Sequence, residues 1–137
     1  MKNPFAKVFR PGRDVRLKTT ILLPDGNRIA LNVNVSEKLR EMVIAQTKAM
    51  QAADAWVKDP DNDELKDVFY ERFSEFLTVI MGKRNFDEAL IAYDLDRVEL
   101  CRRFDKWASE EVVPLVRQAS ALEVEKRKRA YQRMSHA

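Results

Sequence analysis

Two runs of alternating apolar and polar residues, joined by a tight-turn sequence, constrain the fold of this chain more than any other feature. Residues 15–23 and 29–35 carry apolar side chains at nearly every second position, which is the period of a β-strand. Between them, Pro24 presets φ and Gly26 tolerates positive φ, as a tight turn requires. Two alternating runs around an Asp-Gly turn predict a β-hairpin over residues 14–35.

Apolar residues at helical spacing predict four to five helices after the hairpin. Ser36 is a suitable N-cap for the first helix, and the segment 59–62 should end it and cap the second. Gly82 is placed to end the second helix. The apolar stripe of the first helix comprises Leu39, Met42, Val43, Met50, Ala53, Trp56 and Val57. The stripe of the second comprises Leu65, Val68, Phe69, Phe73, Phe76, Leu77 and Ile80.

Shorter helices are predicted in the second half of the chain. Asn85, with a glutamate three residues later, has the arrangement of a capping box and predicts a helix start. Asp94 or Asp96 is expected to cap the next helix. Ser109 is a candidate cap for a final helix, but if the last two helices are continuous, Pro114 should kink them.

The predicted fold class is therefore α+β, mainly α: an N-terminal β-hairpin followed by four to five helices. A chain of 137 residues suits one domain. We expect an irregular basic arm at residues 1–13, a single globular domain at 14–121 and a basic helical tail at 122–137. Within the domain, the hairpin takes residues 14–35 and the helices begin from residue 36.

Charge is segregated along the chain. Residues 1–18 carry six basic residues and one acidic residue, and residues 117–137 carry six and two, whereas the segment between them is mildly acidic. Basic ends suit an acidic partner, nucleic acid or the acidic body of another copy. A single cysteine, no apolar run of about 20 residues and no signal-like N-terminus predict a cytoplasmic protein.

The sequence offers little that resembles a catalytic site. The only histidine, His136, is the penultimate residue, where a base is difficult to hold in place for triad chemistry. Cys101 lies among apolar residues at helical spacing and is expected to pack in the core. The three glycines form no phosphate-binding loop, and no carboxylate pair stands out. We therefore expect neither an enzyme nor a cofactor.

A calcium loop is the one metal site that the spacing suggests. Asp59, Asp61 and Asp63 have the opening spacing of such a loop. However, Glu64 stands where glycine is needed, and Tyr70 stands where the bidentate glutamate belongs. A helix stop and an N-cap explain these acids better.

The basic tail and the hairpin are the features most suggestive of a partner. The tail could lie against phosphates, or form a protein-contacting or solvated face in which Glu123 and Glu125 pair with Arg127 and Arg129. A two-stranded hairpin is marginal alone, and its open edges favour self-association or strand-mediated binding of a partner. We expect a homo-oligomer. Candidate partner-binding residues are Phe86, Tyr93, Trp107, Lys126, Arg127, Lys128, Arg129, Tyr131 and Arg133.

Residues 73–133 carry a distinctive order of helix ends and charges. A helix ends at Gly82 beside two basic residues and an asparagine, and a short helix then runs into residues 93–96. A helix with Trp107 follows, and the chain continues into a Lys/Arg-rich helix at 125–133. This order resembles the tail assembly chaperones of long-tailed bacteriophages.

The resemblance implies a non-enzymatic helper. Such a protein coats the long tape measure protein before the tail tube polymerises, and it is displaced as tube subunits add. The implied partners are the tape measure protein, the tail tube protein and other copies of itself, and the resemblance implies no catalytic residue. Two other functions remain open: a small nucleic-acid-binding protein that uses its basic termini, and a structural connector of a virion.

Overall fold

The predicted hairpin is present. In the computed structural model, which describes residues 14–135, β1 (Arg16–Leu22) pairs antiparallel with β2 (Arg28–Asn34). The register places Leu17 opposite Val33, and both side chains are buried because odd-numbered residues point to the same face. In the turn, Gly26 has φ 87°, which a residue with a Cβ rarely adopts. The sequence pattern therefore predicted both the strands and the turn.

The start of the first helix differs from the prediction. Helix α2 (Leu39–Lys58) begins three residues after Ser36, so the prediction that Ser36 caps it is wrong. The Ser36 Oγ instead accepts a hydrogen bond of 2.9 Å from the backbone N–H of Val15, at the start of the hairpin. The Asn34 side chain accepts from the N–H of Glu37 at 3.0 Å. Ser36 thus ties the two strands together, and the intervening turn delays the helix.

The buried face of α2 also differs from the prediction. The residues of α2 that are buried are Met42 and three alanines, Ala45, Ala49 and Ala52. Small side chains let α2 approach α3 (Asp63–Met81) closely along its length. Three larger apolar residues predicted for the packed face are exposed: Val43, Met50 and Val57.

Helix α3 begins and ends where the sequence predicts. The Asn62 side chain caps it by accepting from the backbone N–H groups of Glu64 and Leu65, at 3.0 and 3.2 Å. At the other end, Gly82 has φ 84° and its N–H donates to the carbonyl of Thr78. Near the Asn62 end, Trp56 of α2 lies 5.6 Å from Phe69, measured between ring centroids. Both rings are partly buried and pack against the edge of the core, so this aromatic contact helps to hold the α2–α3 pair together.

Helix α4 (Lys83–Ala92) begins directly after Gly82, so the prediction that Asn85 caps it is wrong. Asn85 lies inside the helix, and its Nδ2 donates to the Met81 carbonyl at 2.9 Å. The helix ends in a left-handed turn in which Asp94 has φ 56°. Asp96, the second of the two predicted alternatives, caps the next helix by accepting from the N–H of Glu99 at 3.1 Å.

The last two helices are continuous, so Ser109 caps no separate helix. Helix α5 (Arg97–Trp107) passes through a π-helical segment, η1 (Ala108–Val112), into α6 (Val113–Ser135). In this segment the N–H of Val113 donates to the carbonyl of Ala108, five residues back. The wider turn falls directly before Pro114, where the proline ring would clash with an α-helical carbonyl. The kink at Pro114 stays a prediction; what the structure shows there is a π-helical segment within one continuous helical run.

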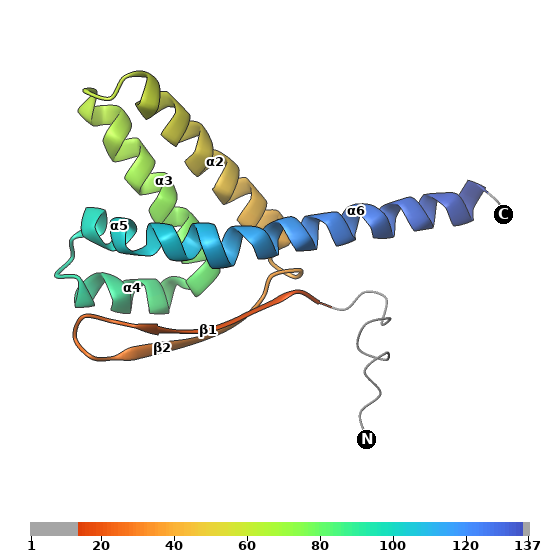
Figure 1. Cartoon of the computed structure of the whole chain (residues 1–137), viewed down its shortest axis with the longest axis horizontal. Coiled ribbons are helices and arrows are strands. Elements are labelled where there is room, and N and C mark those ends of the chain that lie inside the picture. Colours follow the sequence, from red (N-terminus) through yellow and green to blue (C-terminus); the bar gives the residue numbers. More distant parts are fainter. Residues whose placement is uncertain (1–13, 136–137) are drawn as a thin grey trace.

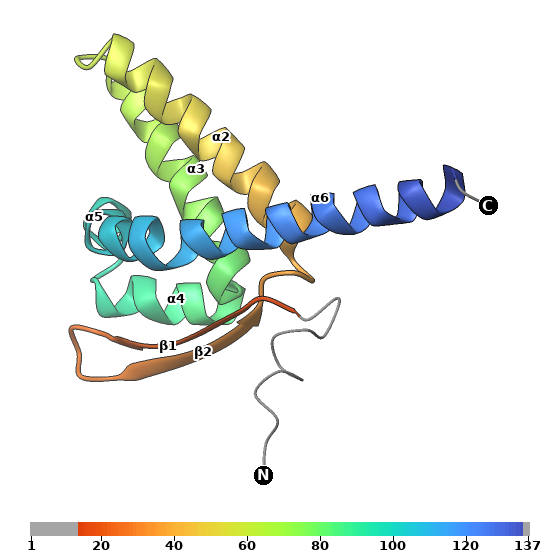
Figure 2. The same cartoon turned by 45° about the vertical axis from the view of Figure 1, so that its right-hand side comes forward.

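Within residues 14–135, the hairpin is thus followed by four helical rods, the last formed by α5, η1 and α6. The apolar face of the hairpin lies along α4 and the C-terminal end of α3, and the α5–α6 rod runs across the body (Figures 1 and 2). Leu77, Ile80, Leu100 and Val112 are fully buried where these elements meet. The α2–α3 pair projects from the body on the side away from the hairpin (Figure 1).

Candidate protein-binding surfaces

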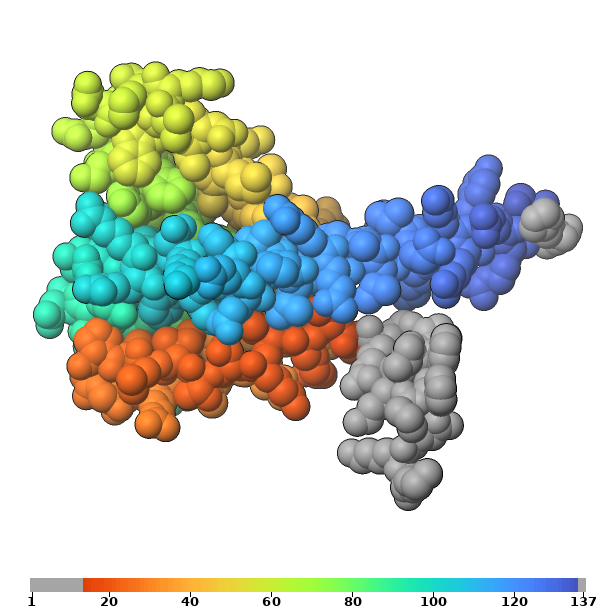
Figure 3. Space-filling model, in the orientation of Figure 1, coloured from red at the N-terminus to blue at the C-terminus, as the bar shows by residue number. Residues whose placement is uncertain are grey.

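The C-terminal part of α6 leaves the body of the molecule. Val116 and Ala119 are the only buried residues of α6 and pack on the body. Beyond them the helix continues to Ser135, and it projects well past the other elements (Figures 1 and 3). We call residues 122–135 the α6 overhang. These residues are helical, as predicted for the basic tail.

The overhang carries the ion pairs that the sequence predicts. Glu123 lies 3.5 Å from Arg127, and Glu125 lies 3.5 Å from Arg129, each one helical turn apart. Such exposed pairs contribute only about 0.3–0.5 kcal/mol each, so they favour the helix weakly and leave the arginines available to a partner.

One face of the overhang is basic. Leu122, Lys126, Arg129 and Arg133 stand at positions i, i+4, i+7 and i+11, so their side chains lie on one side of the helix. All four are exposed. Arg127, Lys128 and Tyr131 point to other sides of the same helix. The structure therefore groups three of the predicted basic residues on one face.

A second surface runs along α2. Val43, Met50 and Val57 are seven residues apart, so they form one line along the helix, and their exposed fractions are 39%, 57% and 76%. We call these three residues the α2 stripe. The seven-residue spacing was present in the sequence, but it was assigned to the core because large apolar side chains usually rank above alanine for burial.

The three aromatic candidates lie in the body and not with the basic residues. Phe86 is 7% exposed and belongs to the core. Tyr93 and Trp107 are half-buried, and each packs edge-on against Phe104, with centroid distances of 6.1 and 5.7 Å. Burial raises the pKa of the Tyr93 hydroxyl, an effect that Arg103 partly opposes. The Trp107 Nε1 is buried without a hydrogen-bond partner among the described residues.

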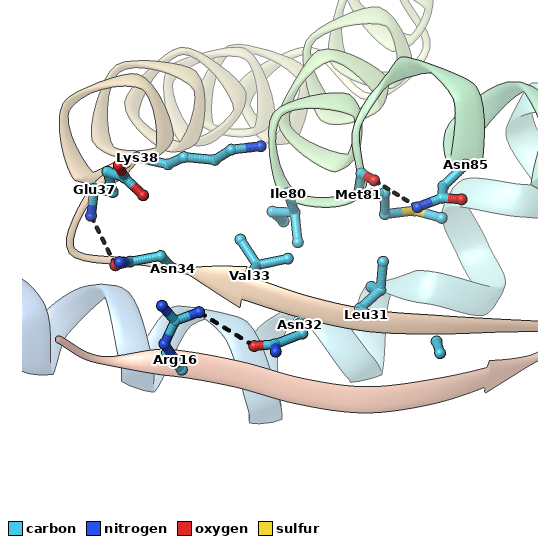
Figure 4. Close-up of a pocket in the computed structure, with 11 residues that line it drawn as sticks. Arg16, Leu31, Asn32, Val33, Asn34, Glu37, Lys38, Ile80, Met81 and Asn85 are labelled. Carbon is cyan, nitrogen blue, oxygen red and sulfur yellow. Dashed lines mark hydrogen bonds between the residues drawn. The ribbon is translucent and has the colours of Figure 1, made fainter.

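A groove of about 420 Å³ follows the outer edge of β2 (Figure 4). Its lining includes residues 30–34 of β2, Lys38 of the turn before α2, and Ile80, Met81 and Asn85. The N–H of Val35 donates to the carbonyl of Val15, so odd-numbered residues form the ladder and Ala30 and Asn32 turn their backbone groups outward. The open edge that the hairpin predicted is therefore accessible beside this groove.

A smaller groove of about 350 Å³ lies where α3, α4 and α5 meet. Its lining is of mixed charge, with Glu71 and Glu75 from α3 beside Lys83 and Arg97. Beneath it Ser74 Oγ lies 3.4 Å from Cys101 Sγ, and burial raises the pKa of the Cys101 thiol, opposed by this contact and by Arg97. Cys101 is buried, as the sequence predicts.

Among residues 14–135, no group of three or more His, Cys, Asp or Glu side chains is placed to hold a metal ion. Every helix in that range is too short or too polar to cross a membrane. Comparison with protein-family models, curated proteins and solved structures found no match to this chain. The arm predicted at residues 1–13 and the predicted position of His136 lie outside the described residues.

Proposed function

We propose that this chain is a non-enzymatic, protein-binding assembly factor that covers apolar helices of a long partner. The observation that carries the proposal is the α2 stripe: three apolar side chains, exposed in one line along a regular helix. The specific role proposed is that of a phage tail assembly chaperone, which holds the tape measure protein before the tail tube polymerises. The resemblance of residues 73–133 to that family supports the choice of partner.

The spacing of the α2 stripe suits a helical partner. Val43 and Val57 are 14 residues apart, which is about 21 Å along an α-helix. A line of side chains at every seventh position packs against another helix at one position in each heptad. A partner helix with apolar residues on one face would cover the α2 stripe over about four turns.

The expected strength of this contact is small for a single copy. Fully burying one such side chain contributes about 1.5–3 kcal/mol, and these three are about half exposed, so their complete burial contributes roughly 3 kcal/mol. Association entropy offsets most of that energy, which leaves a weak and exchangeable contact. Copies that are joined to one another along one long partner bind much more strongly than single copies, and this suits a chaperone that must later be displaced.

The proposal is tested by co-expression with the tape measure protein, measuring how much of that protein stays in the soluble fraction. A triple substitution of Val43, Met50 and Val57 by serine is expected to abolish the protection, because it removes the apolar line and leaves the alanine face intact. The matched control replaces three other exposed apolar residues, all outside α2, by serine: Leu22, Ile91 and Leu95.

The control variant is expected to protect as well as the native chain. Equal protection by both triple variants would remove the α2 stripe as the binding surface. No protection by the native chain would remove the proposed function itself. Circular dichroism of each variant checks that its helices are intact.

A further inference from the structure

The α6 overhang is a helix with no partner in its own chain. Its basic face is formed by Lys126, Arg129 and Arg133 with Leu122, and its ends lie 11 positions apart, or about 17 Å. None of these four side chains is buried. A free helix of this length gains little from its own ion pairs, so a partner surface of opposite charge would stabilise it substantially.

A face of opposite charge and equal length lies on α3. Glu64, Val68, Glu71 and Glu75 stand at positions i, i+4, i+7 and i+11, which is the spacing of the basic face. All four side chains are exposed. Of the three acids, Glu75 pairs with Arg72 at 3.0 Å, whereas Glu64 and Glu71 have no basic side chain within 4.0 Å among the described residues. Each face thus carries three like charges and one apolar residue, with opposite charges beside it: Arg72, Lys83 and Arg97 near the acids of α3, and Glu125 near Arg129.

The two faces cannot meet within one molecule. Helix α6 is a continuous rod whose free end points away from α3 in both views of the molecule (Figures 1 and 2). The body lies between them, and no flexible segment interrupts the described part of α6. A complement for the basic face must therefore come from another molecule, and any other copy of this chain carries a suitable acidic face.

We propose that the α6 overhang of one copy docks on the acidic face of α3 of a second copy. The contact joins two different surfaces, so a bound pair still offers one free overhang, on one copy, and one free α3 face, on the other. Such a heterologous contact closes into a ring or continues as a chain of copies. The α2 stripe is not part of it, so self-assembly and partner binding are separate properties.

The contact depends on charge and therefore on salt. Exposed charges more than about 8 Å apart are screened at physiological ionic strength, while closely docked pairs keep part of their attraction. Overlapped over their full length in either direction, the two faces align two acid–base pairs, so reversing one face is expected to weaken the contact at least about tenfold, since each charge reversal changes affinity several-fold.

Sedimentation velocity of the full chain over a concentration series, at low and at high salt, measures the contact. The native chain is expected to form oligomers that grow with concentration and dissociate in high salt. One variant reverses the overhang (Lys126→Glu, Arg129→Glu, Arg133→Glu), and a second reverses α3 (Glu64→Lys, Glu71→Lys, Glu75→Lys). Each variant alone is expected to be monomeric, because both of its faces then carry the same sign of charge.

Mixing the two variants provides the decisive result. The acidic overhang of the first matches the basic α3 of the second, and the native overhang of the second matches the native α3 of the first, so the mixture is expected to assemble. A matched control reverses three exposed basic residues of α2 (Arg40→Glu, Lys48→Glu, Lys58→Glu), which lowers net charge by as much as the overhang variant does, and it is expected to assemble like the native chain.

Three results would overturn the proposal. The first is a native chain that stays monomeric at high concentration and low salt. The second is a mixture of the two variants that stays monomeric although each retains its helical circular dichroism. The third is a monomeric native chain that shifts duplex DNA in a salt-sensitive manner through the same overhang residues, which would assign the basic face to nucleic acid.

Discussion

Gly82 joins α3 to α4, and its replacement by alanine tests whether the backbone there is as unusual as it appears. The residue has φ 84° and ψ 151°, a region that is nearly exclusive to glycine. A Cβ added at this position meets no atom within 4 Å, so the substitution changes the backbone preference without a steric clash with neighbours. The cost of Gly82→Ala therefore measures the backbone conformation alone.

The expected magnitude follows from two opposing terms. Holding a non-glycine residue in this region costs about 1–3 kcal/mol. Alanine also restricts the unfolded chain, which returns about 0.4–1 kcal/mol. The net loss in the free energy of unfolding is about 1–2 kcal/mol, which leaves a domain of ordinary stability folded.

Urea denaturation followed by circular dichroism measures this loss. With a slope of about 2 kcal/mol per molar urea, the midpoint should fall by roughly 0.5–1 M. D-alanine at position 82, introduced by chemical ligation, is a matched control, because it adds the same methyl group but prefers positive φ, and it should not lower the midpoint. A midpoint for the L-alanine variant equal to the native value would refute the assigned backbone geometry.

Three further predictions concern stability. Asn62→Ala removes two backbone hydrogen bonds at the start of α3, so urea titration should show a loss of about 1 kcal/mol, against little change for Asp61→Ala. Leu77→Ala, at a side chain that is 0% exposed, should lower the free energy of unfolding by about 2–5 kcal/mol. Leu122→Ala on the overhang should change it by less than about 0.5 kcal/mol. Similar losses for the two variants would contradict the burial of Leu77. Burial raises the pKa of Cys101, so the native thiol keeps its proton at a pH where the unfolded thiol loses it. The free energy of unfolding should therefore fall as pH rises above about 8.5. A Cys101→Ala variant whose free energy of unfolding falls equally steeply would exclude this contribution.

The hairpin was predictable because its signals are local. Alternation places Leu17 and Val33 on one face of the hairpin. The turn residues then allow only one register for the two strands. The cap at Asn62 and the stop at Gly82 are local in the same sense, since a side chain or a dihedral angle within one turn decides each. Such features need no knowledge of distant residues.

The wrong cap predictions at Ser36 and Asn85 have a common physical cause: each residue could take part in more than one local arrangement. Ser36 could cap a helix or bond to the hairpin, and only the folded chain brings the N–H of Val15 within 2.9 Å of its hydroxyl. Asn85 could start a helix, but Gly82 had already ended the previous one and allowed α4 to begin directly. In each case the intrinsic preference of the residue fits both arrangements, and the folded surroundings select one of them.

The candidate surfaces were only partly predictable. The ion pairs of Glu123 and Glu125 with residues one turn later follow from helical spacing, and the structure confirms both. The α2 stripe was missed, because close packing against α3 requires alanines and leaves the larger side chains outside. Hydrophobicity alone would rank the residues of the α2 stripe above the alanines for burial, which is the opposite of what the structure shows.

The π-helical segment between Trp107 and Val113 has a consequence for how this molecule can change over time. Each added residue turns an α-helix by about 100°, and the wide turn holds one residue more than α-helical spacing needs. Because that residue fits within the widened turn, loss of a single codon there, such as that of Ser109, would restore α-helical spacing and leave every later side chain near its present direction. The same loss in a regular turn of α6 would rotate every later side chain by roughly 100°, so the π-helical segment is where this helix can lose a residue without re-aiming its far end.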